Sequence, residues 1–316
     1  MMKKLSIIMP VYNATAQQLT RALSSVNNQI GIDFTQVDIH LVNDAGEKIE
    51  PVLFKPHENL DIKLYHLLQN GGSGHARQYG IDHSDGEYVM FMDSDDALYS
   101  VCVLRDFFEL LQKNGEHQII SGKFLYQSRA DNGEFNYQVS NTDNAFVLHG
   151  KFFQRQFLEQ TGLRFHPKLR NYYDDHYFVG LACTMSKDIF SLDSIVYAWL
   201  WNSSSLTRND AGRLEQWLAG ADELRYRLEF LKENQREIAS LFDSCLASYT
   251  NTYKSYADFP EAEQFRFKMK IRQLFDEFPE LYEMLPGRIN VGQGYLYSVL
   301  RSEAFHEFIH WVFAED

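Results

Sequence analysis

The first 130 residues alternate between short apolar segments and amphipathic segments, and this alternation restricts the fold more than any other feature. Strands that are joined through helical crossovers lie parallel, and the helices pack on the two faces of the sheet. The predicted strands are residues 5–11, 37–43, 62–68 and 87–92. We therefore predict an α/β fold built on a mostly parallel sheet.

Local signals place the helices and one hairpin between these strands. Residues 15–29 form a predicted helix, with a T-x-x-Q capping box from Thr15 to Gln18. A second predicted helix begins at residue 103 and ends at Gly115, a residue type that is common just after helices. Residues 123–139 predict a hairpin, because an Asn-Gly pair interrupts them at the position of a tight turn.

The pattern changes after residue 150. Within residues 151–165 we predict a short helix that ends at Gly162. We also predict a strand over residues 194–202. Beyond residue 210 almost every segment has a helical period. These predicted helices span residues 214–231, 236–257, 261–278 and 294–313. The sequence thus predicts a domain boundary near residue 210, with a helical domain from 210 to 316.

Composition excludes several classes of protein. The net charge of -13 disfavours broad binding to nucleic acid or to an anionic membrane. Cys102, Cys183 and Cys245 are scattered without a C-x-x-C spacing, which argues against a disulfide framework or a zinc site. No run approaches the roughly 18 apolar residues of a membrane span, and the N-terminus lacks the pattern of a signal peptide. We therefore expect a cytoplasmic protein without a transmembrane segment.

Three carboxylates follow the fourth predicted strand, in the sequence MDSDD. Two carboxylates about 5 Å apart repel by roughly 3 kcal/mol at an effective dielectric of about 20. In open α/β sheets ligands bind beyond the carboxyl ends of the strands, which is where Asp93, Asp95 and Asp96 fall. Mg²⁺ or Mn²⁺ prefers such oxygen ligands. The alternative is a solvated acidic turn in which Asp96 or Ser100 caps the next helix.

Polar residues also follow the other predicted strands. The glycine-rich stretch of residues 70–81 lets backbone amides approach a ligand closely, and Arg77 within it could reach a phosphate or a base. A flexible loop with a surface arginine is the alternative. Asn43 and Asp44 end the second strand, where either a turn or a ligand contact explains them. Because polar residues recur at the ends of successive strands, we expect them to form one site at one edge of the sheet.

Five motifs occur in an order and at a spacing that resemble those of the family 2 glycosyltransferases, which have a GT-A fold. They are SIIMPVYN, LVNDAG, NGGSGHARQYGI, DGEYVMFMDSDD and GLRFHPKLRNYYDDHYF. The resemblance covers roughly residues 5–208. It implies a GT-A catalytic domain over residues 1–209, with a nucleotide-binding half (1–115) and an acceptor-side half (116–209).

The resemblance also implies a nucleotide site. Tyr12 and Asn13 would lie beside the base, and Asp44 matches the aspartate that contacts uracil. Arg77 matches an arginine near the base and ribose. The full implied set is Pro10, Tyr12, Asn13, Asp44, Gly74, Arg77, Asp93, Ser94 and Arg208. The sequence departs from the family pattern at Asn43 and Ala45, which replace an aspartate and a glycine.

Metal binding and catalysis are assigned to two acidic motifs by the same resemblance. Asp93 and Asp95 match the D-x-D motif, with Asp95 as the main ligand of Mn²⁺ or Mg²⁺ and Asp93 also a ribose contact. Asp175 matches the general base, and Asp174 replaces the glutamate that precedes it. The alternative for Asp175 is the N-cap of the following helix, and both roles are compatible. His176 is more often a structural residue.

The implied activity is an inverting, metal-dependent glycosyl transfer. A sugar from a nucleotide donor, with UDP favoured, would pass by single displacement to a hydroxyl of a surface glycan, a lipid-linked glycan or a glycoprotein. The alternatives are a nucleotidyltransferase and a non-catalytic module that binds sugar nucleotides or glycans; the intact aspartates argue against the module. We further expect a cytoplasmic location that includes the inner face of the membrane, and a homo-oligomer contact through the helical region.

Overall fold

The computed structural model describes residues 3–141, 147–170, 172–203, 213–256 and 259–314. The chain divides into two compact units, Met1–Arg208 and Asn209–Asp316, here named the sheet unit and the helical unit. Each unit has its own buried apolar core.

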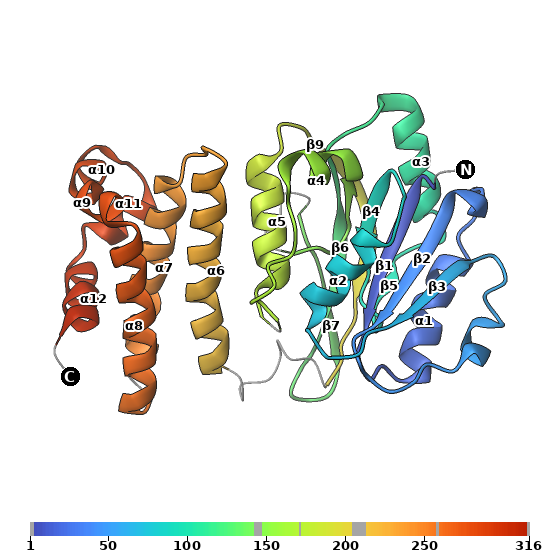
Figure 1. Cartoon of the computed structure of the whole chain (residues 1–316), viewed down its shortest axis with the longest axis horizontal. Coiled ribbons are helices and arrows are strands. Elements are labelled where there is room, and N and C mark those ends of the chain that lie inside the picture. The colour runs from blue at the N-terminus through green and yellow to red at the C-terminus, as the bar shows by residue number, and fades with distance from the viewer. Residues whose placement is uncertain (1–2, 142–146, 171, 204–212, 257–258, 315–316) are drawn as a thin grey trace. The chain divides into compact units, whose positions relative to one another are not determined.

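Four parallel strands form one half of the sheet in the sheet unit (Figure 1). They are β3 (Asp61–His66), β2 (Val37–Asn43), β1 (Leu5–Val11) and β4 (Tyr88–Phe91), in that order across the sheet. The predicted strands over residues 5–11 and 37–43 are confirmed to the residue. The third strand ends at His66, two residues earlier than predicted. All seven residues of β2 are buried, as expected for a strand covered on both faces.

The sheet continues past β4 with mixed strand directions. β8 (Lys151–Gln154) pairs antiparallel with both β4 and β6 (Ile119–Arg129), and β9 (Ile189–Trp199) pairs parallel with β6. The short strand β5 (Ala97–Leu98), which the sequence did not predict, pairs with β9.

The prediction of a helix from residue 151 is wrong for its first turn. Phe152 and Phe153 are both fully buried, one on each face of the sheet, so the apolar pair belongs to a central strand. The helix α4 (Arg155–Thr161) begins only after this strand and ends at Gly162, whose φ is 66°. The predicted strand over residues 194–202 also begins earlier, at Ile189, and ends at Trp199.

Helices cover the faces of this sheet. They are α1 (Ala16–Asn27), α2 (Ser73–Asp82), α3 (Val103–Asn114) and α5 (Asp174–Met185), with the 3₁₀ turns η1 (Phe34–Gln36) and η2 (Pro51–Phe54). The predicted capping box of α1 is confirmed, because Thr15 and Gln18 each accept the other's backbone N–H. α3 ends at Gly115, as predicted.

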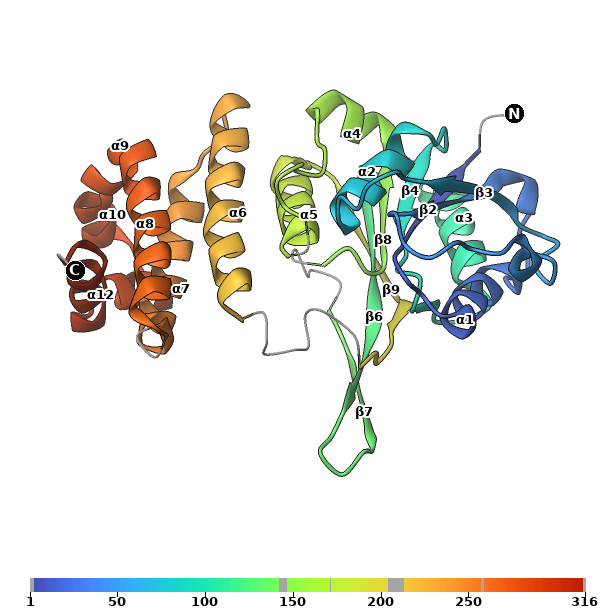
Figure 2. The same ribbon diagram turned by 60° about the horizontal axis from the view of Figure 1, so that its bottom comes forward.

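A long hairpin extends from the sheet (Figure 2). β7 (Phe135–Val139) pairs antiparallel with the second half of β6, around the predicted Asn132-Gly133 turn. Gly133 has a φ of 86°, a conformation that favours glycine.

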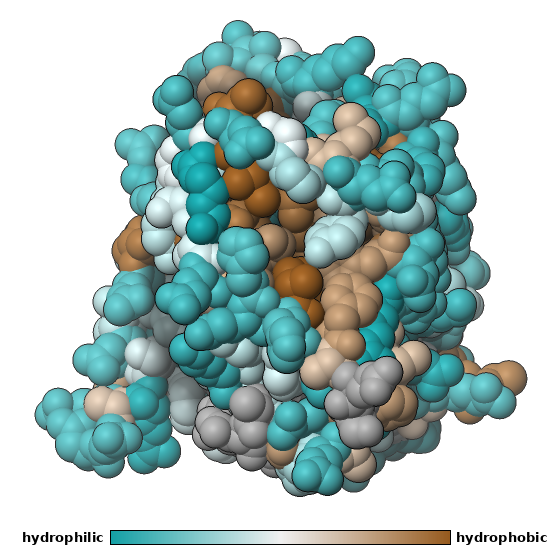
Figure 3. Space-filling view, turned by 90° about the vertical axis from the view of Figure 1, so that its left-hand side faces the viewer, coloured by the Kyte–Doolittle hydropathy of each residue, from teal (hydrophilic) through white to brown (hydrophobic). Residues whose placement is uncertain are grey.

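The helical unit consists of α6 (Arg213–Glu233), α7 (Ala239–Tyr256), α8 (Glu261–Glu277), α9 (Pro279–Glu283), α10 (Leu285–Val291), α11 (Tyr295–Leu300) and α12 (Glu303–Phe313). The single helix predicted over residues 294–313 is two helices, because Ser302 accepts the Phe305 N–H and starts a new one. One face of this unit has apolar surface in its middle and hydrophilic residues around it (Figure 3). No described helix is both long and apolar enough to cross a membrane.

Candidate active site

Asp44 follows β2 and holds the glycine-rich turn in place. Its carboxylate accepts the backbone N–H of Gly71 at 2.9 Å and that of Gly72 at 2.7 Å. Gly72 has a φ of 89°, and a Cβ there would lie 1.9 Å from the carbonyl oxygen of Arg170. This turn therefore requires glycine. Asp44 is 2% exposed, so its position is fixed by the fold.

Arg77, on α2, joins the two acidic motifs. Its guanidinium donates from Nη1 to Asp174 Oδ2 and from Nη2 to Asp93 Oδ1, each at 2.7 Å. Ser73 Oγ donates to the same oxygen of Asp174 at 2.9 Å. Gly74 makes this close approach of α2 and α5 feasible, since a Cβ there would lie 2.9 Å from the Asp174 Cβ.

The predicted contact of Arg77 with base and ribose is not tested by the structure, which shows instead that its guanidinium holds two carboxylates. Burial would lower the pKa of Arg77, but Asp93 and Asp174 raise it above its usual value, so it stays charged. Its Nε is buried without a hydrogen-bond partner among the described residues.

Asp96 is buried and belongs to a cluster of three carboxylates, Asp93, Asp95 and Asp96, rather than capping a helix. Tyr197 on β9 donates its hydroxyl to Asp96 Oδ2 at 2.8 Å and accepts the Asp93 N–H at 2.9 Å. The Leu200 N–H donates to Asp96 Oδ1. α3 begins after Cys102 without a side-chain cap, so the proposed capping role of Asp96 or Ser100 is wrong.

Asp95 lies beside Asp93 and accepts a hydrogen bond from Asn202 Nδ2 at 2.7 Å. Arg21 donates to its backbone carbonyl oxygen. Burial and the charge of Asp93 raise the pKa of Asp95, and the same two causes, with Asp95 added, raise the pKa of Asp96 well above its usual value. The cluster thus holds more negative charge than its neighbours balance.

This charge imbalance and the types of donor atoms fit a divalent cation. Asp93, Asp96 and His149 each offer one ligand atom, and these three atoms lie within 4.8 Å of one another. Two carboxylate oxygens and one imidazole nitrogen are common ligands of divalent metal ions in proteins. His149 was not predicted from sequence. It stacks on Tyr197, with ring centroids 4.7 Å apart, and it lies just before β8, which pairs with β4, the strand that precedes Asp93.

Asp174 and Asp175 are the first two residues of α5. The N-cap is Tyr173, which has a φ of 62°, so the alternative of Asp175 as the N-cap is wrong. Burial and the neighbouring charge of Asp174 raise the pKa of Asp175 to about 6, although Arg77 opposes this. The His176 N–H donates to Asp175 Oδ1 at 2.8 Å. Asp175 remains partly exposed, so its carboxylate is open to solvent.

The remaining predicted site residues differ in their burial and in their contacts. Asn13, with a φ of 52°, accepts the Glu47 N–H at 2.8 Å, so the turns after β1 and β2 touch. Tyr12 is 58% exposed, Pro10 lies within β1, and Ser94 is buried. A hollow of about 310 Å³ adjoins Asn13. Arg208 lies outside the described residues.

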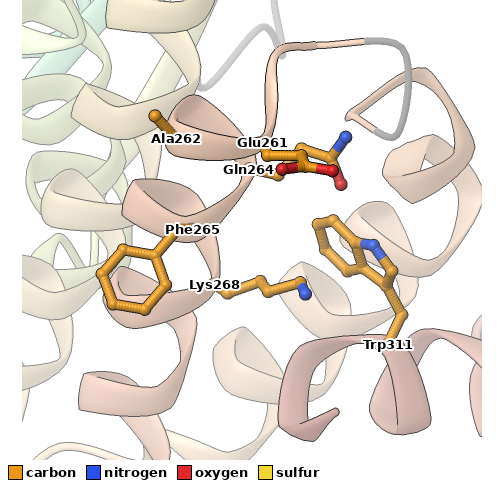
Figure 4. A pocket seen from close by; sticks show the side chains of 6 residues that line it. All are labelled: Glu261, Ala262, Gln264, Phe265, Lys268 and Trp311. Carbon is orange, nitrogen blue, oxygen red and sulfur yellow. The ribbon is translucent and has the colours of Figure 1, made fainter. Parts of the chain in front are cut away.

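A separate pocket lies in the helical unit, with a volume of about 610 Å³. Figure 4 shows Trp311 and Lys268 facing each other across it, and the Lys268 Nζ lies 5.3 Å from the Trp311 ring centroid. Glu261, Gln264 and Phe265 complete most of its lining. The pocket combines aromatic surface with both signs of charge.

A sheet that is parallel over β3, β2, β1 and β4 and mixed beyond β4, with acidic residues and a glycine-rich turn at the carboxyl edge of its parallel half, is the arrangement of a GT-A fold. The family described as Glycosyl transferase family 2 matches residues 6–190, more than half of the chain. The chain belongs to this family, which confirms the resemblance.

Two relatives illustrate the match. The chain is 35% identical over 128 residues to the poly(ribitol-phosphate) beta-N-acetylglucosaminyltransferase TarP of Staphylococcus aureus (strain N315), covering 39% of this chain and 37% of TarP. It is 37% identical over 95 residues to the minor teichoic acid biosynthesis protein GgaB of Bacillus subtilis (strain 168), covering 29% of this chain and 10% of GgaB. The matches thus span well under half of either relative.

A solved structure shares the fold. Residues 1–349 of S. aureus TarS, in complex with UDP-GlcNAc, superpose with a TM-score of 0.64 at 17% sequence identity. The match covers 84% of this chain and 79% of that one. It therefore extends beyond the part of the chain that the family matches.

Proposed function

We propose that this protein transfers a sugar from a UDP-linked donor to a hydroxyl of a surface glycan, with inversion at the anomeric carbon. The observation that carries the proposal is the double ion pair of Arg77. It ties Asp93, at the edge of the sheet, to Asp174, the neighbour of Asp175. Arg77 would thereby keep the donor side close to the segment that contains the general base, and a single displacement needs both beside the reacting carbon.

The donor side is proposed to use the turns after β1 and β2. Asp44 and Asn13 would lie beside the base, and Asp93 beside the ribose. The solved TarS complex contains UDP-GlcNAc, and TarP is named an N-acetylglucosaminyltransferase, which supports UDP-GlcNAc as the first donor to test. Residues 1–115 would then form the nucleotide-binding half.

Asp93 and Asp95 are the proposed ligands of Mn²⁺ or Mg²⁺, with Asp96 and His149 as additional candidates from the geometry. When bound, such an ion supplies positive charge to the departing diphosphate. The raised pKa values of Asp95 and Asp96 support a cation here, because a bound cation favours the ionised carboxylates.

On the acceptor side, Asp175 would accept the proton of the attacking hydroxyl. The His176 N–H fixes one oxygen of this carboxylate, which leaves the other for the substrate. Asp174 is held by Arg77 and Ser73, so its proposed role is to position α5 rather than to take the proton. Attack on the face opposite the diphosphate inverts the anomeric centre.

The acceptor itself is proposed to be a surface polymer. TarP is named for poly(ribitol-phosphate) and GgaB for teichoic acid biosynthesis, which supports a polyol-phosphate chain as the first acceptor to test. Residues 116–209 would shape this side. The pocket of Trp311 and Lys268 combines a ring face with a cation, which suits a polyol phosphate. The scattered cysteines support the cytoplasm as the place of this activity.

The test is a screen of sugar nucleotides with Mn²⁺, with and without poly(ribitol phosphate), read by the nucleotide released. We expect UDP release from UDP-GlcNAc, with faster release when an acceptor is present, and little release by Asp175→Asn. Release of pyrophosphate would instead support a nucleotidyltransferase. Binding of UDP-GlcNAc without turnover across a wide acceptor panel would support a non-catalytic module. NMR of the product would check inversion.

A further inference from the structure

β7 is an open edge of the sheet. In the parts of the chain that the structure describes, it pairs with β6 and with no second strand. Natural edge strands are usually protected by proline, lysine or a bulge, because an open edge pairs with other chains. The sequence of β7, FNYQV, contains neither proline nor any charged residue. Figure 2 shows the hairpin extending beyond the other strands of the sheet unit.

The backbone groups that face this open edge follow from the register. The Ser140 N–H bonds the Phe124 carbonyl, and the Ala130 N–H bonds the Glu134 carbonyl, each at 2.9 Å. Hydrogen-bonded and non-hydrogen-bonded pairs alternate along an antiparallel ladder, so the even-numbered residues of β7 bond to β6. The N–H and C=O groups of the odd-numbered residues therefore point to the open edge.

The same odd-numbered residues are the apolar ones. Phe135, Tyr137 and Val139 share one face of β7 and are 46%, 57% and 50% exposed. Large apolar side chains gathered on one exposed surface mark interaction sites more often than single exposed ones do. The open hydrogen-bonding groups and the apolar face thus belong to the same three residues.

The sequence FNYQV is also nearly symmetrical about Tyr137. In an antiparallel pairing of two copies centred on Tyr137, Phe135 of each copy lies opposite Val139 of the other. Asn136 lies opposite Gln138, so amide faces amide on the second face of the ribbon. Tyr137 lies opposite itself in a hydrogen-bonded pair. Such a two-fold pairing is the commonest symmetry of homodimers.

We propose that two copies of this chain associate through β7, forming a continuous sheet across an antiparallel β7–β7 contact. Backbone hydrogen bonds give the affinity, and the apolar face of Phe135, Tyr137 and Val139 gives the register. The proposal does not rest on the proposed function, because its evidence is the register and the side chains of β7.

Sedimentation over a dilution series of the full chain tests the proposal. We expect a mass twice the 36.9 kDa of the chain at high concentration. Tyr137→Lys should raise the dissociation constant at least about 30-fold, because like charges then lie opposite each other at the centre of the contact. Asp131→Lys, which adds the same residue in the hairpin turn, should leave it unchanged. A wild type that stays at the monomer mass, or a dimeric Tyr137→Lys, overturns the proposal.

Two further variants keep the test valid if the lysine disturbs folding. Tyr137→Pro removes an N–H that faces the open edge, where proline is tolerated, so the hairpin should remain while the dimer is lost. Tyr137→Cys should form a disulfide between copies, because Cα atoms in such a pair are about 5.5 Å apart. Asp131→Cys should not. A Tyr137→Pro dimer, or no cross-link at residue 137, shows that association, if any, uses another surface.

Discussion

Carboxylates are buried near both ends of the parallel strands, but the number of partners that balance their charge differs between the two ends. Near the amino ends, Asp38 on β2 is fully buried and accepts hydrogen bonds from Ser6, His40 and Lys63 at 2.7, 3.1 and 2.7 Å. Near the carboxyl ends, Asp93 of the D-x-D motif and Asp174 of α5 share the guanidinium of Arg77. The first end is balanced in charge, and the second is not.

The pKa values express this difference. Burial alone would raise the pKa of Asp38, but its hydrogen bonds, from His40 and Lys63 above all, hold it well below the usual range. At the other end, burial and neighbouring carboxylates raise the pKa values of Asp96 and Asp175. A carboxylate whose partners are all supplied by the chain serves the fold. Carboxylates that share too few partners are suited to receive a ligand.

The largest expected effect is on turnover at the unbalanced end. Asp175→Asn keeps the size of the side chain but removes its basicity, so kcat should fall by roughly 10² to 10⁴ while the donor Kd stays within about threefold. Because the base must be ionised, the wild-type rate should fall as pH drops through about 6. Steady-state kinetics against pH would check both. Near-normal turnover in Asp175→Asn would transfer the role to Asp174.

At the balanced end, the effect should be on stability instead. Asp38→Asn leaves Lys63 and His40 without their carboxylate and should lower the free energy of unfolding by about 3 kcal/mol, measured in urea. Asp61→Asn, which removes an exposed partner of Lys3, should cost less than about 1 kcal/mol. In the wild type, the contribution of Asp38 is present above pH 3.8 and is lost as pH falls below that value. Equal costs for the two variants would contradict the comparison.

Ligands should stabilise the protein through the unbalanced end. UDP at about 100 times its Kd should add about 2.7 kcal/mol with Mn²⁺ present. The shift in Tm should be much smaller in EDTA, and Asp95→Asn should remove the difference between the two conditions. If UDP raises the Tm of the wild type equally in EDTA, the metal does not bind with the nucleotide.

The nucleobase contact should have a smaller effect. Asp44→Ala should weaken UDP binding by about 1 to 3 kcal/mol, through a lost polar partner and through release of the Gly71 and Gly72 amides. Calorimetry with UDP, GDP and CDP separates these causes, because a loosened turn weakens all three equally. A wild-type preference for GDP would remove Asp44 from the base site.

The smallest expected effect is a gain in stability rather than a loss. Without divalent ions, Asp95→Asn should raise the free energy of unfolding by about 1 kcal/mol, because it removes one repelling charge from the cluster. Urea unfolding in EDTA checks this value. A variant less stable than the wild type would mean that the bond from Asn202 outweighs the repulsion from Asp93.

The sequence predicted what local patterns determine. β1 and β2 were predicted to the residue, because short strand-like segments that alternate with helical ones are typical of an α/β fold with parallel strands. β8 was missed, since two adjacent phenylalanines followed by a helical pattern do not distinguish a four-residue strand from a first helical turn. The assignments of Asp93, Asp95 and Asp175 came from motif resemblance, and their chemical roles stay predictions.

Contacts between residues that lie far apart in the sequence could not be predicted from local patterns. Tyr197 joins the cluster because β9 pairs with β5, which follows the aspartates directly. His149 reaches Asp93 only through the pairing of β8 with β4. The hydrogen bond between Arg77 and Asp174 spans 97 positions of the chain. Spacing along a single sequence does not specify such contacts.

The close contacts of Gly72 with Arg170 and of Gly74 with Asp174 have a practical consequence for protein engineering. A side chain at position 72 would collide with the Arg170 backbone, and one at position 74 would press on Asp174. Loop exchange between relatives would therefore have to move the turn at residues 70–74 and the segment at 170–175 together, as a single cassette. Exchanging only one of these two segments would place it against a neighbour with a different shape, even if every predicted site residue were kept.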